Sequence, residues 1–157
     1  MDMTHYMGLI ADNQPWNLII FMALPVIMAE TLVATEFFVV FRHLTTGALR
    51  QFNKVLGIVL GLYMLGIFVK MITIIPGIEW NTWVDVVAVW GYTLGALPLI
   101  GIALLELGLI CRKQTDQDKM KIHFLLITAF LVLGHVAMVF GMVNPSILKG
   151  AAAGHTM

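Results

Sequence analysis

Charged residues are scarce in this sequence: they make up 11% of its 157 residues, and nine Lys and Arg balance nine Asp and Glu. Hydrophobic residues account for 60% and the mean hydropathy is +0.92, so too few polar side chains remain to cover a water-soluble surface. The balanced charge provides no basic surface for nucleic acid. The sequence therefore predicts an integral membrane protein that has the lipid bilayer as its surroundings and no nucleic-acid partner.

Cysteines and enzyme motifs are also lacking. Cys111 is the single cysteine, which excludes a disulfide within the chain and a metal site with two thiolates. The sequence has no Gly-rich phosphate loop, no Gly-x-Ser-x-Gly elbow and no His-Glu-x-x-His pair, and its polar connections are too short for a catalytic domain. These absences favour a protein that is not an enzyme and that carries no cofactor, with haem b and copper as the alternatives argued below.

Long apolar runs are what the sequence has in quantity. Four of them lie near residues 16–41, 54–76, 82–111 and 122–143, and each can span a membrane because about 20 helical residues cross a hydrocarbon core of about 30 Å. Short connections make successive helices antiparallel. We therefore predict an all-α integral membrane protein with one membrane domain over residues 1–157. Its fold is an antiparallel four-transmembrane-helix bundle with short tails at residues 1–15 and 144–157.

The positions of basic residues predict the orientation of this bundle. Most of them fall in or beside the first and third connections: Arg42, Arg50, Lys54, Arg112, Lys113, Lys119 and Lys121. Because basic residues concentrate on the cytoplasmic side of membrane proteins, both termini should face outward. The sequence predicts a multi-pass protein of a bacterial inner (plasma) membrane with periplasmic N- and C-termini.

Two carboxylates lie inside the first apolar run, at Glu30 and Glu36. A charge at this depth costs roughly 2.5 to 3.5 kcal/mol, so each needs a partner or a function. The two residues are about 120° apart around a helix, so both cannot face the bundle axis. We expect Glu30 inside and Glu36 toward a neighbouring helix, another subunit or the inner interface. Pro25 leaves the carbonyl of Phe21 without its helical donor.

Ionisable residues on every predicted helix suggest a first functional hypothesis. A permease-like protein would move protons or a small ion along an intramembrane polar track centred on Glu30, Lys70 and His135. The full set of expected track residues is Glu30, Glu36, Lys70, Asp85, Tyr92, Glu106 and His135. The structural alternative is a buried Glu30–Lys70 ion pair that holds two helices in register.

A second hypothesis is a redox subunit. Axial haem ligands must come from different helices at matching depth, and His43 and His123 meet that condition near the inner surface. His123 and Glu106 at the same end are candidates for binding a quinone. Two interfacial histidines among basic residues are the structural alternative.

A third hypothesis is copper handling. His135, Met138 and Met142 share one helix face, and the tails contribute further ligands of the same type: Met1, Met3, His5, Met7, His155 and Met157. Thioether and imidazole groups suit Cu(I). Methionine is also a common lipid-facing and core residue, which is the structural alternative. A carboxylate-bridged metal pair is disfavoured because the Glu-x-x-His spacing is absent.

Pairs of glycines suggest close helix contacts. Gly57 with Gly61, and Gly91 with Gly95, form small faces on which helix backbones can approach. They fit packing within one bundle, or an interface in a homo-oligomer or a larger membrane complex. A further alternative is a non-catalytic accessory or assembly subunit, whose sign would be a polar face turned to lipid, with Glu36 as the residue that would contact its partner.

Overall fold

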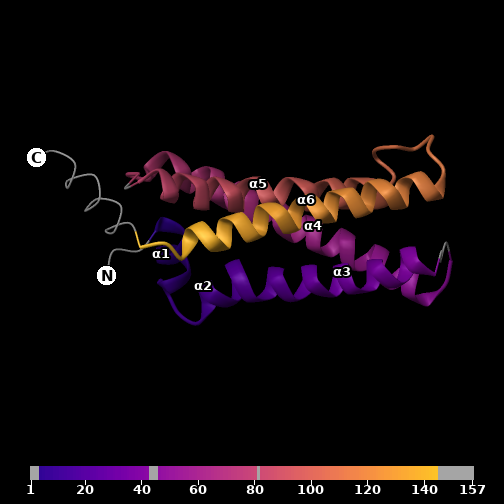
Figure 1. Cartoon of the computed structure of the whole chain (residues 1–157), viewed down its shortest axis with the longest axis horizontal. Coiled ribbons are helices and arrows are strands. Elements are labelled where there is room, and N and C mark those ends of the chain that lie inside the picture. Colours follow the sequence, from indigo (N-terminus) through magenta and orange to yellow (C-terminus); the bar gives the residue numbers. More distant parts are fainter. Residues whose placement is uncertain (1–3, 43–45, 81, 145–157) are drawn as a thin grey trace, which may run out of the picture.

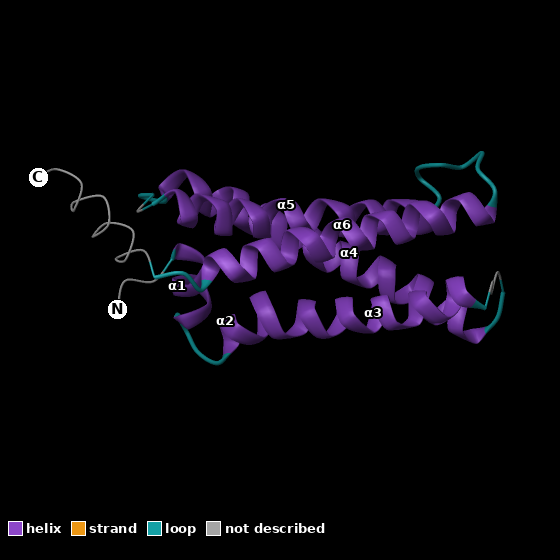
Figure 2. Ribbon diagram, in the orientation of Figure 1, coloured by secondary structure: helices purple, strands orange, loops and turns teal. Residues whose placement is uncertain are grey.

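The computed structural model describes residues 4–42, 46–80 and 82–144, and within these ranges the regular structure is entirely helical (Figures 1 and 2). Four continuous stretches are long and apolar enough to cross a membrane: Trp16–Phe41, Ala48–Gly77, Trp83–Glu106 and Asp116–Gly141. The prediction of an all-helical membrane protein with four spanning helices is confirmed. The elements in chain order are α1 (His5–Ala11), α2 (Trp16–Leu18), the π-helix η1 (Ile19–Ala23), α3 (Leu24–Phe41), α4 (Ala48–Ile74), the 3-10 turn η2 (Ile75–Gly77), α5 (Trp83–Glu106) and α6 (Asp116–Gly141).

Helix boundaries differ from the predicted ones where capping overrides hydrophobicity. α5 ends at Glu106 rather than near residue 111, because Gly108 has a φ of 72° and reverses the chain. The N–H of Gly108 bonds to the Leu105 carbonyl and that of Leu109 to the Leu104 carbonyl, both at 3.0 Å. α6 begins six residues earlier than predicted, at Asp116, because the Thr115 side chain caps it. α4 begins at Ala48 rather than near residue 54, although no side chain caps it.

The four long helices run side by side (Figure 1), and α5 has the largest buried share of them. α5 packs along α6 on one side and α4 on the other, whereas α3 packs mainly on α4 and touches α6 only lightly. We call the end where α3 passes to α4, and α5 to α6, the loop end. The opposite end, which holds α1 and η2, is the terminal end (Figure 1).

Neighbouring helices of the same chain pack against the glycine faces. A Cβ atom on Gly61 would lie 2.4 Å from the Cβ of Ala103 and 2.5 Å from the Leu99 carbonyl oxygen, and one on Gly91 would lie 3.4 Å from Ala137. Gly57 and Gly95 face Ile102 and Leu133 in the same way. Neighbouring helices of the same chain cover these faces, which fits the alternative of packing within one bundle.

Part of the predicted N-terminal tail is a folded element. Thr4 caps α1 by accepting a hydrogen bond from the Met7 N–H, and its hydroxyl donates to the Gly141 carbonyl at 2.7 Å. Tyr6 and Ile10 are buried against the helices. This segment of the predicted tail over residues 1–15 is thus a short helix that packs on the spanning helices at the terminal end. The predicted C-terminal tail, apart from residue 144, lies outside the described residues.

The first span begins irregularly, as its proline requires. Pro25 has no N–H for the Phe21 carbonyl, and the Tyr92 hydroxyl donates to that carbonyl at 2.6 Å. The Tyr63 hydroxyl donates to the adjacent Ile20 carbonyl at 2.7 Å. The π-helix and the proline thus leave backbone acceptors that tyrosines of α4 and α5 satisfy, which ties the start of the first span to the other helices.

Candidate functional site

The structure reverses the expected roles of the two glutamates in the first span. Glu36 is 1% exposed and lies on the packed face of α3, whereas Glu30 lies on the exposed face. The packed face consists of residues spaced three and four apart: Pro25, Ala29, Leu32, Glu36 and Val39. The placement of Glu30 in the interior is wrong, because this spacing marks the contact face and Glu30 is not part of it.

The two other residues at the centre of the expected track also face outward. Lys70 is exposed on α4, and His135 is exposed on α6, where its Nδ1 donates to the Leu131 carbonyl of its own helix at 2.6 Å. The structure therefore does not bring Glu30, Lys70 and His135 together. The Glu30–Lys70 pair that would have held two helices in register is not formed either.

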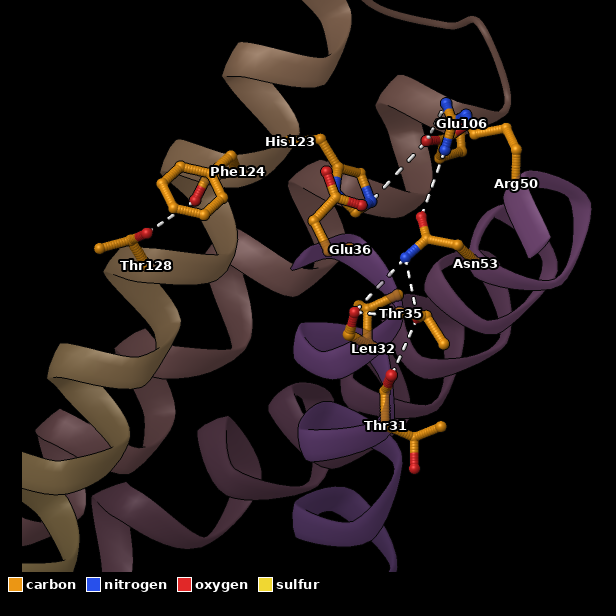
Figure 3. Close-up of polar contacts among 10 residues, drawn as sticks. All are labelled: Thr31, Leu32, Thr35, Glu36, Arg50, Asn53, Glu106, His123, Phe124 and Thr128. Atoms are coloured by element: carbon orange, nitrogen blue, oxygen red, sulfur yellow. Dashed lines mark hydrogen bonds and ion pairs between the residues drawn. The ribbon is translucent and has the colours of Figure 1, made fainter. Parts of the chain in front are cut away.

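A different polar cluster occupies the interior near the loop end (Figure 3). His123 of α6 lies between two carboxylates: its Nδ1 is 3.1 Å from Oε1 of Glu36, and its Nε2 is 3.7 Å from Oε1 of Glu106. Arg50 of α4 pairs with the same Glu106 oxygen at 2.8 Å and donates to the Asn53 side chain at 3.2 Å. All four long helices contribute, so we call Glu36, Arg50, Asn53, Glu106 and His123 the loop-end cluster.

Hydrogen bonding is complete on one side of the loop-end cluster and incomplete on the other. The Asn53 amide donates to the Thr35 hydroxyl at 3.0 Å and to the Leu32 carbonyl at 3.4 Å (Figure 3). Glu36 and His123 are close to one another, yet neither carboxylate oxygen of Glu36 and neither ring nitrogen of His123 has an aligned hydrogen bond. Buried polar atoms without such bonds are rare and costly, so they require an explanation.

The charges of the loop-end cluster offer that explanation. Two carboxylates face one guanidinium, and the charges balance only if His123 or a carboxylate carries a further proton. Both Glu36 and His123 are 1% exposed, and an uncompensated charge at such burial is expensive. The arrangement therefore places a carboxylate and an imidazole, two groups whose chemistry allows them to carry a proton, 3.1 Å from one another. Within the described residues, the two Glu36 oxygens and the two His123 ring nitrogens have no hydrogen-bond partner.

The remaining track residues lie at the terminal end. Asp85 is fully buried and accepts a bond from the backbone N–H of His5 at 2.7 Å, while its second oxygen pairs with the His5 ring. Tyr92 packs against Tyr6 with ring centroids 5.0 Å apart and bonds to the Phe21 carbonyl. Burial raises the pKa of Tyr6 to about 12. These residues join α1 to the spanning helices.

Several residues of the cofactor hypotheses lie outside the described residues, among them Met1, Met3, His155 and Met157. His43 lies outside the described residues, and both ring nitrogens of His123 face carboxylates. His135, Met138 and Met142 do share one face of α6, and that face is exposed. Among residues 4–42, 46–80 and 82–144, no group of three or more His, Cys, Asp or Glu side chains is placed to hold a metal ion.

Two members of the loop-end cluster were missed by sequence reasoning. Arg50 and Asn53 were assigned to a connection, because the apolar run begins only after them. The buried residues of α4 nevertheless follow a spacing of three and four that includes Asn53 and Gly57. Extending that stripe by one turn toward the N-terminus would have placed both side chains on the interior face.

The fold and the loop-end cluster define the class of protein. It is a small helical membrane protein whose long helices enclose a cluster of acidic, basic and histidine side chains. Within that class the chain belongs to a family of unknown function, DUF6803, whose family model matches residues 1–157. The chain matches no curated protein and no solved structure.

Proposed function

We propose that this protein is permease-like and moves protons, or a small ion coupled to a proton, with the loop-end cluster as its proton-binding site. The observation that supports the proposal is the position of His123, buried between carboxylates of α3 and α5. Imidazole can accept a proton at one ring nitrogen and release one at the other. The ring thus connects Glu106, near the loop end, with Glu36 deeper in the protein.

Access to the site differs between the two sides. Toward the loop end, Arg50 and Glu106 separate His123 from the surroundings, and Arg50 is partly exposed. Toward the terminal end, the described interior is apolar over Leu60, Met64 and Leu99, each at most 2% exposed. A proton taken up from the loop side can continue only if helices separate in this apolar layer, which is how carriers alternate access to a fixed site.

α3 is the helix best suited to such a movement. It packs mainly on α4 and only lightly on α6, so it has fewer contacts to break than α5. Displacement of α3 would carry Glu36 away from His123 and separate the two proton-binding groups. In our proposal the loop end faces the cytoplasm of a bacterial inner membrane, since it carries most of the basic residues.

Proton flux into liposomes tests the proposal. The purified protein is reconstituted around a pH-sensitive dye, and a potassium gradient with valinomycin drives proton entry. Glu36→Gln and His123→Asn should each abolish protein-dependent flux, because each removes one proton-binding group. Glu30→Gln is the matched control, since it makes the same change on the exposed face of the same helix and should retain flux.

Two outcomes would contradict the proposal. Wild-type flux in folded Glu36→Gln would show that this carboxylate carries no proton. Loss of flux in Glu30→Gln with retention in Glu36→Gln would return the pathway to the exposed face of α3. Thermal unfolding of each variant in detergent establishes that it is folded before its flux is compared.

A further inference from the structure

A polar cleft opens between α4 and α6 at the loop end, beside the loop-end cluster. Its volume is about 190 Å³, and its lining residues are Arg50, Gln51, Lys54, Asp116, Lys119 and Met120. The α4 side contributes residues of its first two turns, and the α6 side contributes residues of its first two turns. The cleft therefore lies where two helix ends meet the edge of the membrane-spanning region.

The cleft carries more positive charge than its neighbours neutralise. Arg50 is paired with Glu106, whereas Lys119 lies 4.0 Å from Asp116, whose side chain is 81% exposed. A pair at that distance and exposure contributes little. Lys54 makes no ion pair with any residue in the described ranges. The cleft thus has a cation on each wall with capacity for a further anion.

The chemistry of the lining fits a phosphate group. Two ammonium groups and a guanidinium supply charge-assisted donors, and the Gln51 amide adds a neutral one. Basic clefts between spanning helices near the membrane surface are suited to the headgroups of anionic lipids. Phe52, next to Gln51 on α4, and Phe124, one turn beyond Met120 on α6, are about half exposed and provide apolar surface near the cleft.

We infer that this cleft binds a phosphate group, carried either by an anionic phospholipid or by free phosphate. The inference does not depend on proton transport. Arg50 belongs to both the cleft and the loop-end cluster, so a bound phosphate would compete with Glu106 for the guanidinium (Figure 3). Occupancy of the cleft would then leave more negative charge beside His123.

Binding is measured on the purified full-length protein in detergent. The probes are phosphatidylglycerol, phosphatidylcholine and inorganic phosphate, each titrated while thermal unfolding and lipid adducts in native mass spectrometry are recorded. The cleft variant is Lys54→Gln with Lys119→Gln. The control variant is Lys113→Gln with Lys121→Gln, which removes the same charge from exposed lysines at the same end but outside the cleft. Arg50 is left unchanged in both.

The cleft variant should bind phosphatidylglycerol about tenfold more weakly than the wild type, while the control variant should bind it nearly as well. Displacement of phosphatidylglycerol by inorganic phosphate would identify a site for the free anion, and retention of the lipid would identify a headgroup site. Equal weakening in the two variants would reveal attraction to surface charge alone and overturn the inference. So would binding that does not distinguish phosphatidylglycerol from phosphatidylcholine, or no binding of any probe.

Discussion

The two ends of the protein each bury an acidic residue against a histidine from another element, but the hydrogen bonding of the carboxylate differs between them. At the terminal end, both oxygens of Asp85 have partners in His5, whose side chain is 34% exposed. At the loop end, neither oxygen of Glu36 has an aligned hydrogen bond, and His123 is 1% exposed. An acidic residue and a histidine therefore form a hydrogen-bonded pair at the terminal end and a pair without an aligned hydrogen bond at the loop end.

This difference separates a structural role from a chemical one. A buried carboxylate that accepts bonds from a backbone N–H and a ring is held in one charge state and one position, and it fixes the element that bonds to it. The Glu36 carboxylate has no such bonds, and its close neighbour is the His123 ring, whose Nδ1 lies 3.1 Å from Oε1. Asp85 thus anchors α1, whereas Glu36 is a proton-binding group in our proposal.

The largest effect on stability is expected at the anchor. Asp85→Ala removes the acceptor for both the N–H and the ring of His5, and should lower the free energy of unfolding by about 3 kcal/mol. Thermal unfolding in detergent measures this loss, and hydrogen exchange should show α1 exposed. Asp12→Ala is the control, because Asp12 is an exposed carboxylate just after the same helix. Equal unfolding temperatures for the two variants would contradict the anchoring role.

A second effect at the terminal end depends on pH. Burial raises the pKa of Tyr6 to about 12 from 10.0, so the folded protein favours the neutral phenol. The associated stability is fully present below pH 10 and is lost as pH rises toward 12. The loss should be about 1.4 kcal/mol at about pH 11. Comparing unfolding of the wild type and Tyr6→Phe from pH 8 to about 11 isolates this term, and parallel pH profiles would contradict it.

The tyrosines that bond to the irregular start of the first span should show a graded effect. Tyr92→Phe removes the donor to the Phe21 carbonyl in a partly buried setting and should cost about 1 kcal/mol. Tyr63→Phe removes the equivalent bond to the Ile20 carbonyl in an exposed setting and should cost less. Unfolding temperatures of the two variants provide the measurement. A larger loss for Tyr63→Phe would mean that burial does not set the value of these bonds.

Only part of the structure at the terminal end could be predicted from the sequence. The four spans follow from hydrophobic runs, and the unpaired Phe21 carbonyl follows from Pro25. That Tyr92 supplies the donor could not be predicted, since it depends on how α5 is rotated against the first span. The pairing of His5 with Asp85 joins residues far apart in sequence, through a segment that composition alone classified as a tail.

The loop end shows a different limit of sequence reasoning. Helical geometry established that only one of Glu30 and Glu36 could face inward, but the choice needed the packed face of α3, which is marked by Ala29, Leu32 and Val39. Arg50 and Asn53 were hidden by their polarity, because polar residues beyond an apolar run are normally assigned to a loop. The helical spacing of these residues therefore predicts that they are buried, whereas their hydropathy does not.

The smallest change in stability is expected at Glu36, the residue that our proposal makes a proton-binding group. Glu36→Leu replaces an unbonded buried carboxylate by an apolar side chain beside Leu32 and Val39, and should shift the free energy of unfolding by no more than about 1 kcal/mol, in either direction. Asp85→Leu makes the same chemical change at a bonded carboxylate and should be strongly destabilising.

The two leucine variants, unfolded under identical conditions in the same detergent, decide whether hydrogen bonding distinguishes the ends. If Glu36→Leu is as destabilised as Asp85→Leu, the Glu36–His123 contact holds the helices together and the loop-end cluster is structural. If Glu36→Leu keeps its stability and loses proton flux, Glu36 contributes a proton-binding group and little to the fold. Its burial without hydrogen bonds would then be explained by function, because a fully bonded carboxylate could not exchange its proton with His123.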